Sequence, residues 1–197
     1  MTAHIHLVRH GHHALLGRIL CGRMPGVYLD ERGCREMAAT AEAMWLMEPR
    51  TIQSSPQRRA LQSASIIASR CGLPVEVVPA FDEIDMGLWT GARFADLAED
   101  VKWQQWNERR DIATPPDGES MAALQNRAIG HLQQLTDHEG SIVIVSHAEP
   151  IRAALMYYLG IPLDLFYALE VDPGSVSTIV LEGKQTTVAS VNKVVWA

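Results

Sequence analysis

Apolar positions divide the chain into short runs typical of strands and longer runs with helical spacing. The strand-like runs occupy residues 3–8, 51–54, 75–78, 141–146, 166–171, 176–181 and 186–194. The helical stretches occupy residues 31–47, 56–71, 95–110, 120–135 and 150–159. Strands that alternate with helices predict an α/β fold, a three-layer α/β/α sandwich with a mostly parallel central sheet.

No internal repeat, low-complexity tract or convincing linker interrupts this pattern, so residues 1–197 are predicted to form one domain. The length of 197 residues suits a single domain of larger than average size. With 47% hydrophobic and 20% charged residues, the composition is that of an ordinary globular protein.

Net charge, the length of the apolar stretches and the cysteine content limit which partners and which cellular compartment are expected. The net charge is -6, and no basic stripe of the kind that nucleic-acid-binding domains carry is present. The apolar stretches stay well short of the ~18 residues that a membrane span needs, and no obvious secretion signal opens the chain. Three cysteines without a C-x-x-C pair argue against a disulfide framework. We expect a cytoplasmic protein that binds neither nucleic acid nor a membrane.

Polar residues with catalytic potential follow three of the predicted strands. Residues 9–11 read R-H-G, residues 55–59 read S-P-Q-R-R and residues 146–148 read S-H-A. The carboxyl ends of parallel strands meet at one edge of the sheet, where ligands bind. Two histidines and two arginines are therefore expected to lie together, with Glu83 and Asp85 close enough to join them.

These residue types suit phosphoryl transfer. Arginine presents a planar fork of donors that matches phosphate oxygens and stays charged at any working pH. A neutral imidazole can attack phosphorus, and a carboxyl group of raised pKa can protonate the departing oxygen. The set therefore indicates a dianion pocket that works through a phosphohistidine.

Five ordered blocks resemble the signature motifs of the histidine phosphatase superfamily, which includes cofactor-dependent phosphoglycerate mutases and small broad-specificity phosphatases. The blocks are L-V-R-H-G at 7–11, S-S-P-Q-R-R-A at 54–60, E-I-D-M-G-L-W-T-G at 83–91, G-E-S at 118–120 and V-S-H-A at 145–148. The resemblance covers nearly the whole sequence and implies a phosphoglycerate mutase-like fold.

The resemblance also implies a role for each matched residue. His10 becomes the nucleophile, Glu83 becomes the acid and later the base for water, and Arg9, Arg59 and His147 hold the phosphoryl oxygens. Because these cations supply the positive charge, no metal and no cofactor is expected. The implied activity is that of a metal-independent, histidine acid-type phosphatase that hydrolyses a small phosphorylated substrate.

The choice between two neighbouring arginines depends on Pro56. The family's variable position lies two residues beyond this proline and corresponds to Arg58, so Arg59 matches the phosphate-binding arginine. We expect Arg58 to be a surface residue or a secondary contact.

Several positions depart from the family pattern. After R-H-G the family commonly has an acidic or amide residue, then Thr or Ser, and shortly afterwards an Asn that helps to hold phosphate. Here these positions read His12, His13 and Leu16, so a phosphate contact is either missing or replaced, for example by His12. Gly22 is added as a candidate substrate contact. Ala148 stands where the family usually has glycine.

Four alternatives to a phosphomonoester hydrolase are retained. Mutases of the family read E-R-H-Y-G at the acid and carry a longer insertion before the late helix, whereas residues 83–87 read E-I-D-M-G and no long insertion is present. Hydrolysis is therefore favoured over mutase-type transfer. A phosphohistidine-protein phosphatase is disfavoured because its short members tend to lack the catalytic glutamate. The others are a phosphate-binding homologue without turnover, and a zinc site of N-terminal histidines with Cys21 or His147, whose spacing lacks the helical i, i+4 pattern.

The remaining aromatic and histidine residues have structural interpretations. Trp103 and Trp106 are spaced to form one buried helix face, with the wall of a substrate pocket as the alternative. His4 and His6 alternate on the first strand, where packing or a hydrogen bond within the sheet is expected. A homodimer stays open as an oligomeric state.

Overall fold

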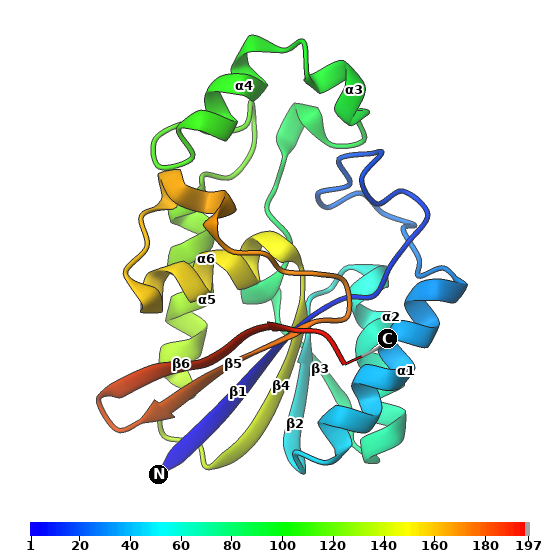
Figure 1. Cartoon of the computed structure of the whole chain (residues 1–197), viewed down its shortest axis with the longest axis vertical. Coiled ribbons are helices and arrows are strands. Elements are labelled where there is room, and N and C mark those ends of the chain that lie inside the picture. The colour runs from blue at the N-terminus through cyan, green and yellow to red at the C-terminus, as the bar shows by residue number, and fades with distance from the viewer. Residues whose placement is uncertain (196–197) are drawn as a thin grey trace.

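The computed structural model describes residues 1–195 and is built around one six-stranded sheet (Figure 1). The strands, in spatial order, are β3 (Val75–Val77), β2 (Pro49–Ser54), β4 (Gly140–Ser146), β1 (Thr2–Arg9), β5 (Val176–Glu182) and β6 (Gln185–Lys193). The first four strands are mutually parallel, whereas β5 runs antiparallel to β1 and β6 antiparallel to β5. The predicted mostly parallel sheet is confirmed.

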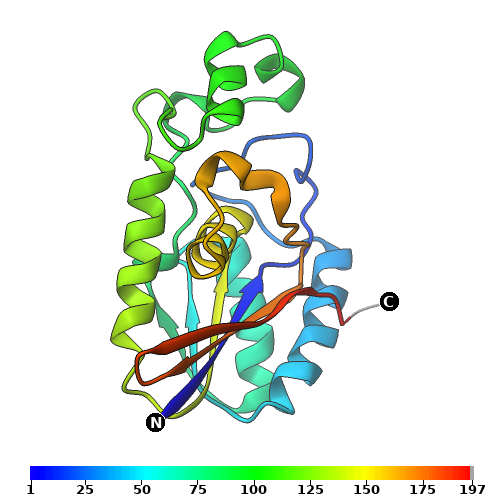
Figure 2. The same cartoon turned by 60° about the vertical axis from the view of Figure 1, so that its left-hand side comes forward.

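Four long helices cover the two faces of the sheet. Helices α1 (Glu31–Trp45) and α2 (Arg58–Cys71) share one hydrophobic cluster with Val8 of β1. Helices α5 (Met121–Gln134) and α6 (Ala148–Leu159) pack with Ile5 and Leu7 of the same strand in another cluster. Successive side chains of a strand point to opposite faces, which explains how β1 contributes to both clusters. Figure 2 shows α5 and α1 on opposite sides of the sheet, as the predicted sandwich requires.

A smaller set of elements lies beyond the carboxyl ends of the strands, at the top of Figure 1. We call this set the cap; it comprises η2 (Gly87–Trp89), α3 (Phe94–Leu97), α4 (Val101–Glu108) and η3 (Leu163–Ala168), whereas η1 (Pro79–Phe81) packs against α5 and β4. Most of it shares a third hydrophobic cluster, which also holds residues of α5 and α6. The cap is therefore packed onto the sandwich by its own core.

Two predicted elements differ from the structure. The single helix predicted for 95–110 is broken into α3 and α4, because Asp100 accepts hydrogen bonds from the backbone N–H groups of Lys102 and Trp103 and so starts a new helix. The strand predicted around 166–171 is wrong: the turns of η3 occupy the first half of that run, the second half is not a strand either, and Phe166 is fully buried in the cap cluster. A short apolar run does not distinguish a strand from a buried helical turn.

The remaining helices begin near their predicted positions. Asp30 caps α1 by accepting a hydrogen bond of 2.9 Å from the N–H of Gly33. Within residues 1–195, none of the helices has both the length and the apolar character that crossing a bilayer requires.

Candidate active site

The register of the central strands brings three polar turns together. Arg9, the last residue of β1, pairs with Ser146, the last residue of β4, and Ser54 at the end of β2 pairs with Val145. The N–H of His10 donates a hydrogen bond of 2.9 Å to the carbonyl of Ser146. As a result, the ring centroids of His10 and His147 are only 5.1 Å apart. The meeting of the two histidines follows directly from the parallel pairing of β1 with β4.

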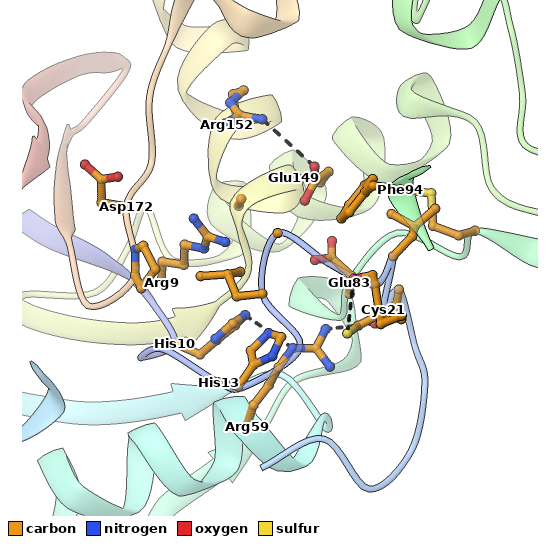
Figure 3. A pocket seen from close by; sticks show the side chains of 18 of the residues that line it. Arg9, His10, His13, Cys21, Arg59, Glu83, Phe94, Glu149, Arg152 and Asp172 are labelled. Carbon is orange, nitrogen blue, oxygen red and sulfur yellow. Dashed lines mark hydrogen bonds and ion pairs between the residues drawn. The ribbon is translucent and has the colours of Figure 1, made fainter. Parts of the chain in front are cut away.

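A cavity of about 480 Å³ opens over this edge of the sheet, between the strand ends and the cap (Figure 3). Its wall has two parts of different chemistry. The strand-end half is defined by Arg9, His10, His13, Gly22, Arg59 and Glu83. The outer half is defined by Phe94, Trp103, Trp106, Arg110, Arg152 and Tyr167. Of the seven site residues expected from the sequence, five line the cavity directly, and His147 contacts two of these.

His10 is held as a neutral imidazole with a defined tautomer. Its Nδ1 lies 2.8 Å from the carbonyl oxygen of Gly11, which only accepts, so Nδ1 carries the proton. Its Nε2 then has a lone pair and accepts a hydrogen bond of 3.2 Å from Nε of Arg59. Burial, followed by the positive charges of Arg59 and Arg9, lowers the pKa of His10 well below its usual value. The ring nitrogen that carries the lone pair is therefore Nε2.

Arg59 is buried at the start of α2, and the preceding Arg58 is exposed. Its Nη2 donates a hydrogen bond of 2.8 Å to the carbonyl of Gly22. Gly22 has a φ of +47°, and a Cβ there would lie 3.2 Å from the side chain of Met86, so both backbone and space favour glycine. Nη1 of Arg59 is buried and has no hydrogen-bond partner. This geometry agrees with the choice of Arg59 over Arg58.

Arg9 is fixed to the loop that leads into β5. Its Nη1 donates a hydrogen bond of 2.6 Å to the carbonyl of Val171, while its Nε is buried without a partner. Burial lowers the pKa of Arg9, and the charges of Glu149 and Glu83 act in the opposite direction. Arg9, like Arg59, therefore keeps one donor free at the strand-end half.

His147 is fully buried, with its Nε2 2.7 Å from the hydroxyl of Ser55. Its Nδ1 has no hydrogen-bond partner and lies 3.8 Å from Oε2 of Glu83. Burial and the charges of Arg59, His10 and Arg9 lower its pKa well below the usual value, so this ring is also neutral. Ser55, which contacts this ring, was not singled out from the sequence, although it lies inside the S-S-P block.

Glu83 is only 7% exposed and faces the same group of side chains. Burial, reinforced by the negative charge of Glu149, raises the pKa of Glu83 to about 8. Its Oε1 accepts a hydrogen bond of 2.8 Å from the N–H of Ile84, and its own N–H donates to Asp82. At neutral pH this carboxyl group is mostly protonated and can act as a proton donor.

Comparison with known proteins decides the family. The sequence profile of the histidine phosphatase superfamily (branch 1) matches residues 5–194. The chain belongs to this superfamily. The resemblance inferred from the five sequence blocks is thereby confirmed, and so is the phosphoglycerate mutase-like fold.

Relatives within the superfamily include both hydrolases and mutases. The chain is 29% identical over 178 residues to phosphoserine phosphatase 1 of Hydrogenobacter thermophilus, with 87% of this chain and 84% of that protein covered. It is 25% identical over 201 residues to the 2,3-bisphosphoglycerate-dependent phosphoglycerate mutase of Thermoplasma acidophilum, with 94% and 92% covered. The structure of a mycobacterial glucosyl-3-phosphoglycerate phosphatase with VO3 superposes with a TM-score of 0.84 at 26% identity, covering 96% of this chain and 98% of that one.

This member of the superfamily uses its unusual R-H-G-H-H turn in a way that the sequence did not reveal. The ring of His12 pairs with Asp30 at 2.6 Å, and its backbone N–H donates to Glu36. These contacts tie the turn to the start of α1, and His12 is not part of the cavity wall. His13 lines the cavity instead, with its ring 5.4 Å from that of His10. Its Nδ1 is unpartnered, and burial followed by the charge of Arg59 lowers its pKa to about 4.

The other departures from the superfamily pattern are also located. Leu16, at the position of the usual asparagine, lines the cavity and offers no polar contact there. Ala148 begins α6 and is buried. In addition, Asp85 accepts a hydrogen bond of 2.9 Å from the N–H of Gly87 and, unlike Glu83, is not part of the cavity wall that it was expected to join.

The structural interpretations of other residues are mostly confirmed. Trp106 is fully buried, Trp103 is partly buried, and both line the cavity. This helix face is therefore both part of the buried core and part of the cavity wall. Nδ1 of His6 lies 3.1 Å from the hydroxyl of Thr178 on the neighbouring strand, as expected. His4 is exposed, so the prediction that its side chain is packed is wrong. Across residues 1–195, no three or more His, Cys, Asp or Glu side chains are arranged to hold a metal ion.

Proposed function

We propose that this protein hydrolyses phosphomonoesters through a covalent phosphohistidine on His10. The observation that carries the proposal is the neutral ring of His10, whose Nε2 lone pair is held by Arg59 in the same cavity as the protonated carboxyl group of Glu83. A nucleophile and a proton donor are thus present in one cavity, each in the protonation state that the first step needs.

In the first step, the hydrogen bond from Nε of Arg59 to His10 Nε2 breaks, and the lone pair of Nε2 forms a bond to phosphorus while the bond from phosphorus to the ester oxygen breaks. The departing oxygen takes the proton of Glu83, so the leaving group departs as a neutral alcohol. Glu83 becomes a carboxylate near His147, whose Nδ1 lies 3.8 Å away. The products of this step are the alcohol and the phosphorylated His10.

In the second step, water attacks phosphorus and gives one proton to the carboxylate of Glu83. The bond between His10 Nε2 and phosphorus breaks, which restores the imidazole lone pair and releases inorganic phosphate. Glu83 is protonated again and ready for the next cycle. One carboxyl group therefore acts as acid in the first step and as base in the second.

Three unpartnered buried donors are assigned to the phosphoryl oxygens: Nε of Arg9, Nη1 of Arg59 and Nδ1 of His147. For His147 to donate from Nδ1 as a neutral ring, the single hydroxyl proton of Ser55 must turn from Asp82, to which it donates at 3.1 Å, to Nε2 of His147 at 2.7 Å. Ser55 is therefore a positioning residue for His147. Because two guanidinium groups supply the charge, the proposed reaction needs neither a metal nor a cofactor.

Hydrolysis is proposed rather than mutase-type transfer. The position that mutases fill with an arginine next to the acid is Ile84, which is fully buried in the cap cluster and cannot contact substrate. The names of the phosphatase relatives support a small phosphorylated substrate. A cytoplasmic location and a chain that acts as one domain stay predictions from composition and pattern.

A trapping experiment tests the proposal. The full chain is mixed with a phosphomonoester labelled with ³²P and quenched in alkali, and label bound to protein is measured before and after acid treatment. We expect alkali-stable, acid-labile label on wild-type protein and none on His10→Ala. Release of free phosphate that continues in excess chelator supports the metal-independent route. Label that persists in His10→Ala, or stoichiometric metal whose removal stops turnover, would overturn it.

A further inference from the structure

The G-E-S block is the sequence motif that the proposed reaction leaves without a role. Gly118 lies so close to Asp85 that a Cβ on it would be 2.5 Å from the carbonyl oxygen of Asp85, so this position requires glycine. The N–H of Glu119 donates a hydrogen bond of 2.8 Å to the same oxygen. Ser120 caps α5 by accepting a hydrogen bond of 3.1 Å from a backbone N–H. The block therefore joins the start of α5 to the segment that carries Glu83.

The side chain of Glu119 pairs with two arginines from different parts of the chain. Arg127 of α5 donates from Nε to Oε1 at 2.7 Å and from Nη2 to Oε2 at 2.9 Å, which is the bidentate geometry of a strong charge-assisted pair. The side chains of Glu119 and Arg127 are 15% and 21% exposed, so solvent screens their pair only weakly. Arg23, in the loop between β1 and α1, donates from Nη2 to Oε2 at 3.1 Å. We call Arg23, Glu119 and Arg127 the clamp, and none of the three lines the cavity.

Both arginines of the clamp bind the same backbone oxygen, the carbonyl of Glu83. Arg23 donates to it from Nε at 2.8 Å, and Arg127 donates to it from Nη2 at 3.2 Å. Arg127 also donates from Nη1 to the carbonyl of Ala80 at 2.7 Å. The clamp therefore holds the backbone at the proposed acid and at the residue three positions before it.

The peptide that carries this carbonyl also binds the carboxyl group of Glu83. Its N–H, that of Ile84, donates a hydrogen bond of 2.8 Å to Oε1 of Glu83. The C=O and N–H of a trans peptide lie in one plane and point in opposite directions, so groups that fix the oxygen also aim the N–H. Two guanidinium groups on the oxygen also polarise the peptide and strengthen its N–H as a donor. Oε1 thus acts as the acceptor, which leaves the acidic proton to Oε2, 3.8 Å from Nδ1 of His147.

We propose that the clamp positions Glu83 so that its acidic proton lies on Oε2. Arg23 and Arg127 hold the carbonyl of the peptide whose N–H occupies Oε1, and Glu119 keeps the two guanidinium groups in place. The three are positioning residues, since they act on the reaction only through Glu83. The inference rests on the proposed function, because it concerns the proton donor of the first step.

The proposal predicts which substrates are affected by a weakened clamp. An alkyl phosphate releases a strongly basic oxygen that needs the proton of Glu83, so a misdirected proton slows its first step. A nitrophenyl phosphate releases an anion that is stable without a proton, so its first step depends little on Glu83. Loss of a merely structural ion pair would instead slow both esters alike through disturbed packing.

The test removes both charges of the central ion pair at once. The clamp variant, Glu119→Gln with Arg127→Gln, keeps side-chain size and leaves neither charge unpaired. With the full chain in excess over substrate, release of the alcohol in a single turnover reports the first step alone. For the alkyl phosphate this rate is expected to fall ~10- to 100-fold, as for a catalytic group displaced by about 1 Å. For the nitrophenyl phosphate it is expected to change little.

Two further variants locate the effect. Glu42 and Arg70 form an ion pair of the same kind, Nε to Oε1 at 2.7 Å, between α1 and α2, and neither lines the cavity. Glu42→Gln with Arg70→Gln is expected to leave both rates unchanged. Arg127→Lys keeps the charge but cannot bind all the acceptors of the guanidinium together, so a smaller loss confined to the alkyl ester is expected.

The pH profile gives a second readout that packing alone would not move. Burial raises the pKa of Glu83 to about 8, and the hydrogen bond from the N–H of Ile84 acts in the opposite direction. The clamp variant weakens this bond without changing the net charge, so the pKa of Glu83 is expected to rise further and the alkaline limb for the alkyl phosphate to move to higher pH. The other ionisable groups around Glu83 stay in place: Arg9 of β1, Cys21 of the loop before α1, Arg59 of α2, Asp82, His147 after β4 and Glu149 of α6.

The outcomes separate this inference from the proposed function. Equal losses for the two esters in the clamp variant, or an alkaline limb that does not move, overturn the clamp while His10 and Glu83 keep their proposed roles. If no label is trapped on wild-type His10 but the clamp variant slows the alkyl ester alone, the covalent mechanism fails and the clamp stands. If the clamp variant does not fold, as judged by its melting curve, Arg127→Lys decides by the same comparison of esters.

Discussion

The two halves of the cavity are built on different principles. In the strand-end half, the charged groups follow β1, β2 and β4, and backbone carbonyls hold them: Gly11 for His10, Gly22 for Arg59 and Val171 for Arg9. In the outer half, side chains from the cap hold one another: Trp103 and Trp106 stack at 5.5 Å, and Arg110 lies over the latter.

This difference separates chemistry from specificity. The parallel register of the central strands fixes the positions of the proposed nucleophile and phosphate donors, so any substrate would meet the same groups there. The cap has its own hydrophobic cluster and is not part of the sheet, so its inward-facing side chains can differ without disturbing the catalytic residues. We therefore expect substitutions in the strand-end half to affect all substrates, and those in the outer half to affect some of them.

The largest effect is expected from His10→Ala. Without a nucleophile no covalent intermediate forms, and kcat is expected to fall by at least ~10⁴-fold for every substrate, whatever its leaving group. Steady-state assays on an alkyl and an aryl phosphate measure this. A residual rate within ~10-fold of wild type, far above what loss of a nucleophile permits, would show that water attacks phosphorus directly.

Glu83→Gln is expected to have the next largest effect, and an unequal one. Loss of a positioned general acid costs ~10²- to 10⁴-fold for an alkyl phosphate, whose leaving oxygen needs a proton. A nitrophenyl phosphate, whose leaving group is stable as an anion, is expected to lose much less in the first step. Equal losses for both esters contradict the role of proton donor.

The same residue predicts a pH dependence. Because burial raises the pKa of Glu83 to about 8, the donor is present below that pH and is lost as the pH rises through it. The wild-type rate of the first step on an alkyl phosphate is therefore expected to fall above pH 8, and this alkaline limb is expected to disappear in Glu83→Gln. On the acid side, His10 and His147 have lowered pKa values and stay neutral well below their usual range.

Arg59 and Arg58 offer a matched pair of substitutions, and the expected effect on kcat/KM is of intermediate size. Arg59→Lys keeps the charge but loses the planar fork that contacts His10 and Gly22, so kcat/KM is expected to fall ~10²- to 10³-fold. Arg58→Lys changes an exposed side chain and is expected to leave kcat/KM unchanged. A loss in Arg58→Lys with none in Arg59→Lys would mean that the family alignment at Pro56 is shifted by one residue.

The sequence predicted the strand-end half well because its residues are adjacent to strands. Arg9, His10 and His147 follow buried strands whose parallel pairing is favoured by the alternation with helices, and the family motifs add Arg59 and Glu83. The acceptor of the His10 ring proton was not predictable, since it depends on the course of the turn at Gly11. Ser55 was missed because its contact is with a residue 92 positions away.

The outer half was predicted much less well. The tryptophans of α4 were recognised by their spacing, but Arg110 was not singled out, because its burial depends on contacts with Phe166 and Tyr167 in η3. That segment was wrongly predicted to be a strand, and apolar content alone did not reveal its turns. Long-range packing between two irregular segments leaves no periodic pattern in a sequence.

The smallest effects on activity are expected from substitutions of His12 and His13, in the turn that follows His10. His13→Ala removes an unpartnered ring that lines the cavity beside His10, and kcat/KM is expected to fall ~3- to 10-fold, the value of one hydrogen bond to substrate. His12→Ala removes the pair with Asp30 outside the cavity, so Tm is expected to drop by ~1–3 °C with kcat/KM unchanged. The reverse pattern, with activity lost in His12→Ala, would mean that His12 leaves Asp30 when substrate binds. His12 would then make the phosphate contact that the sequence analysis expected of it. Parallel assays and melting curves of the two variants distinguish these outcomes.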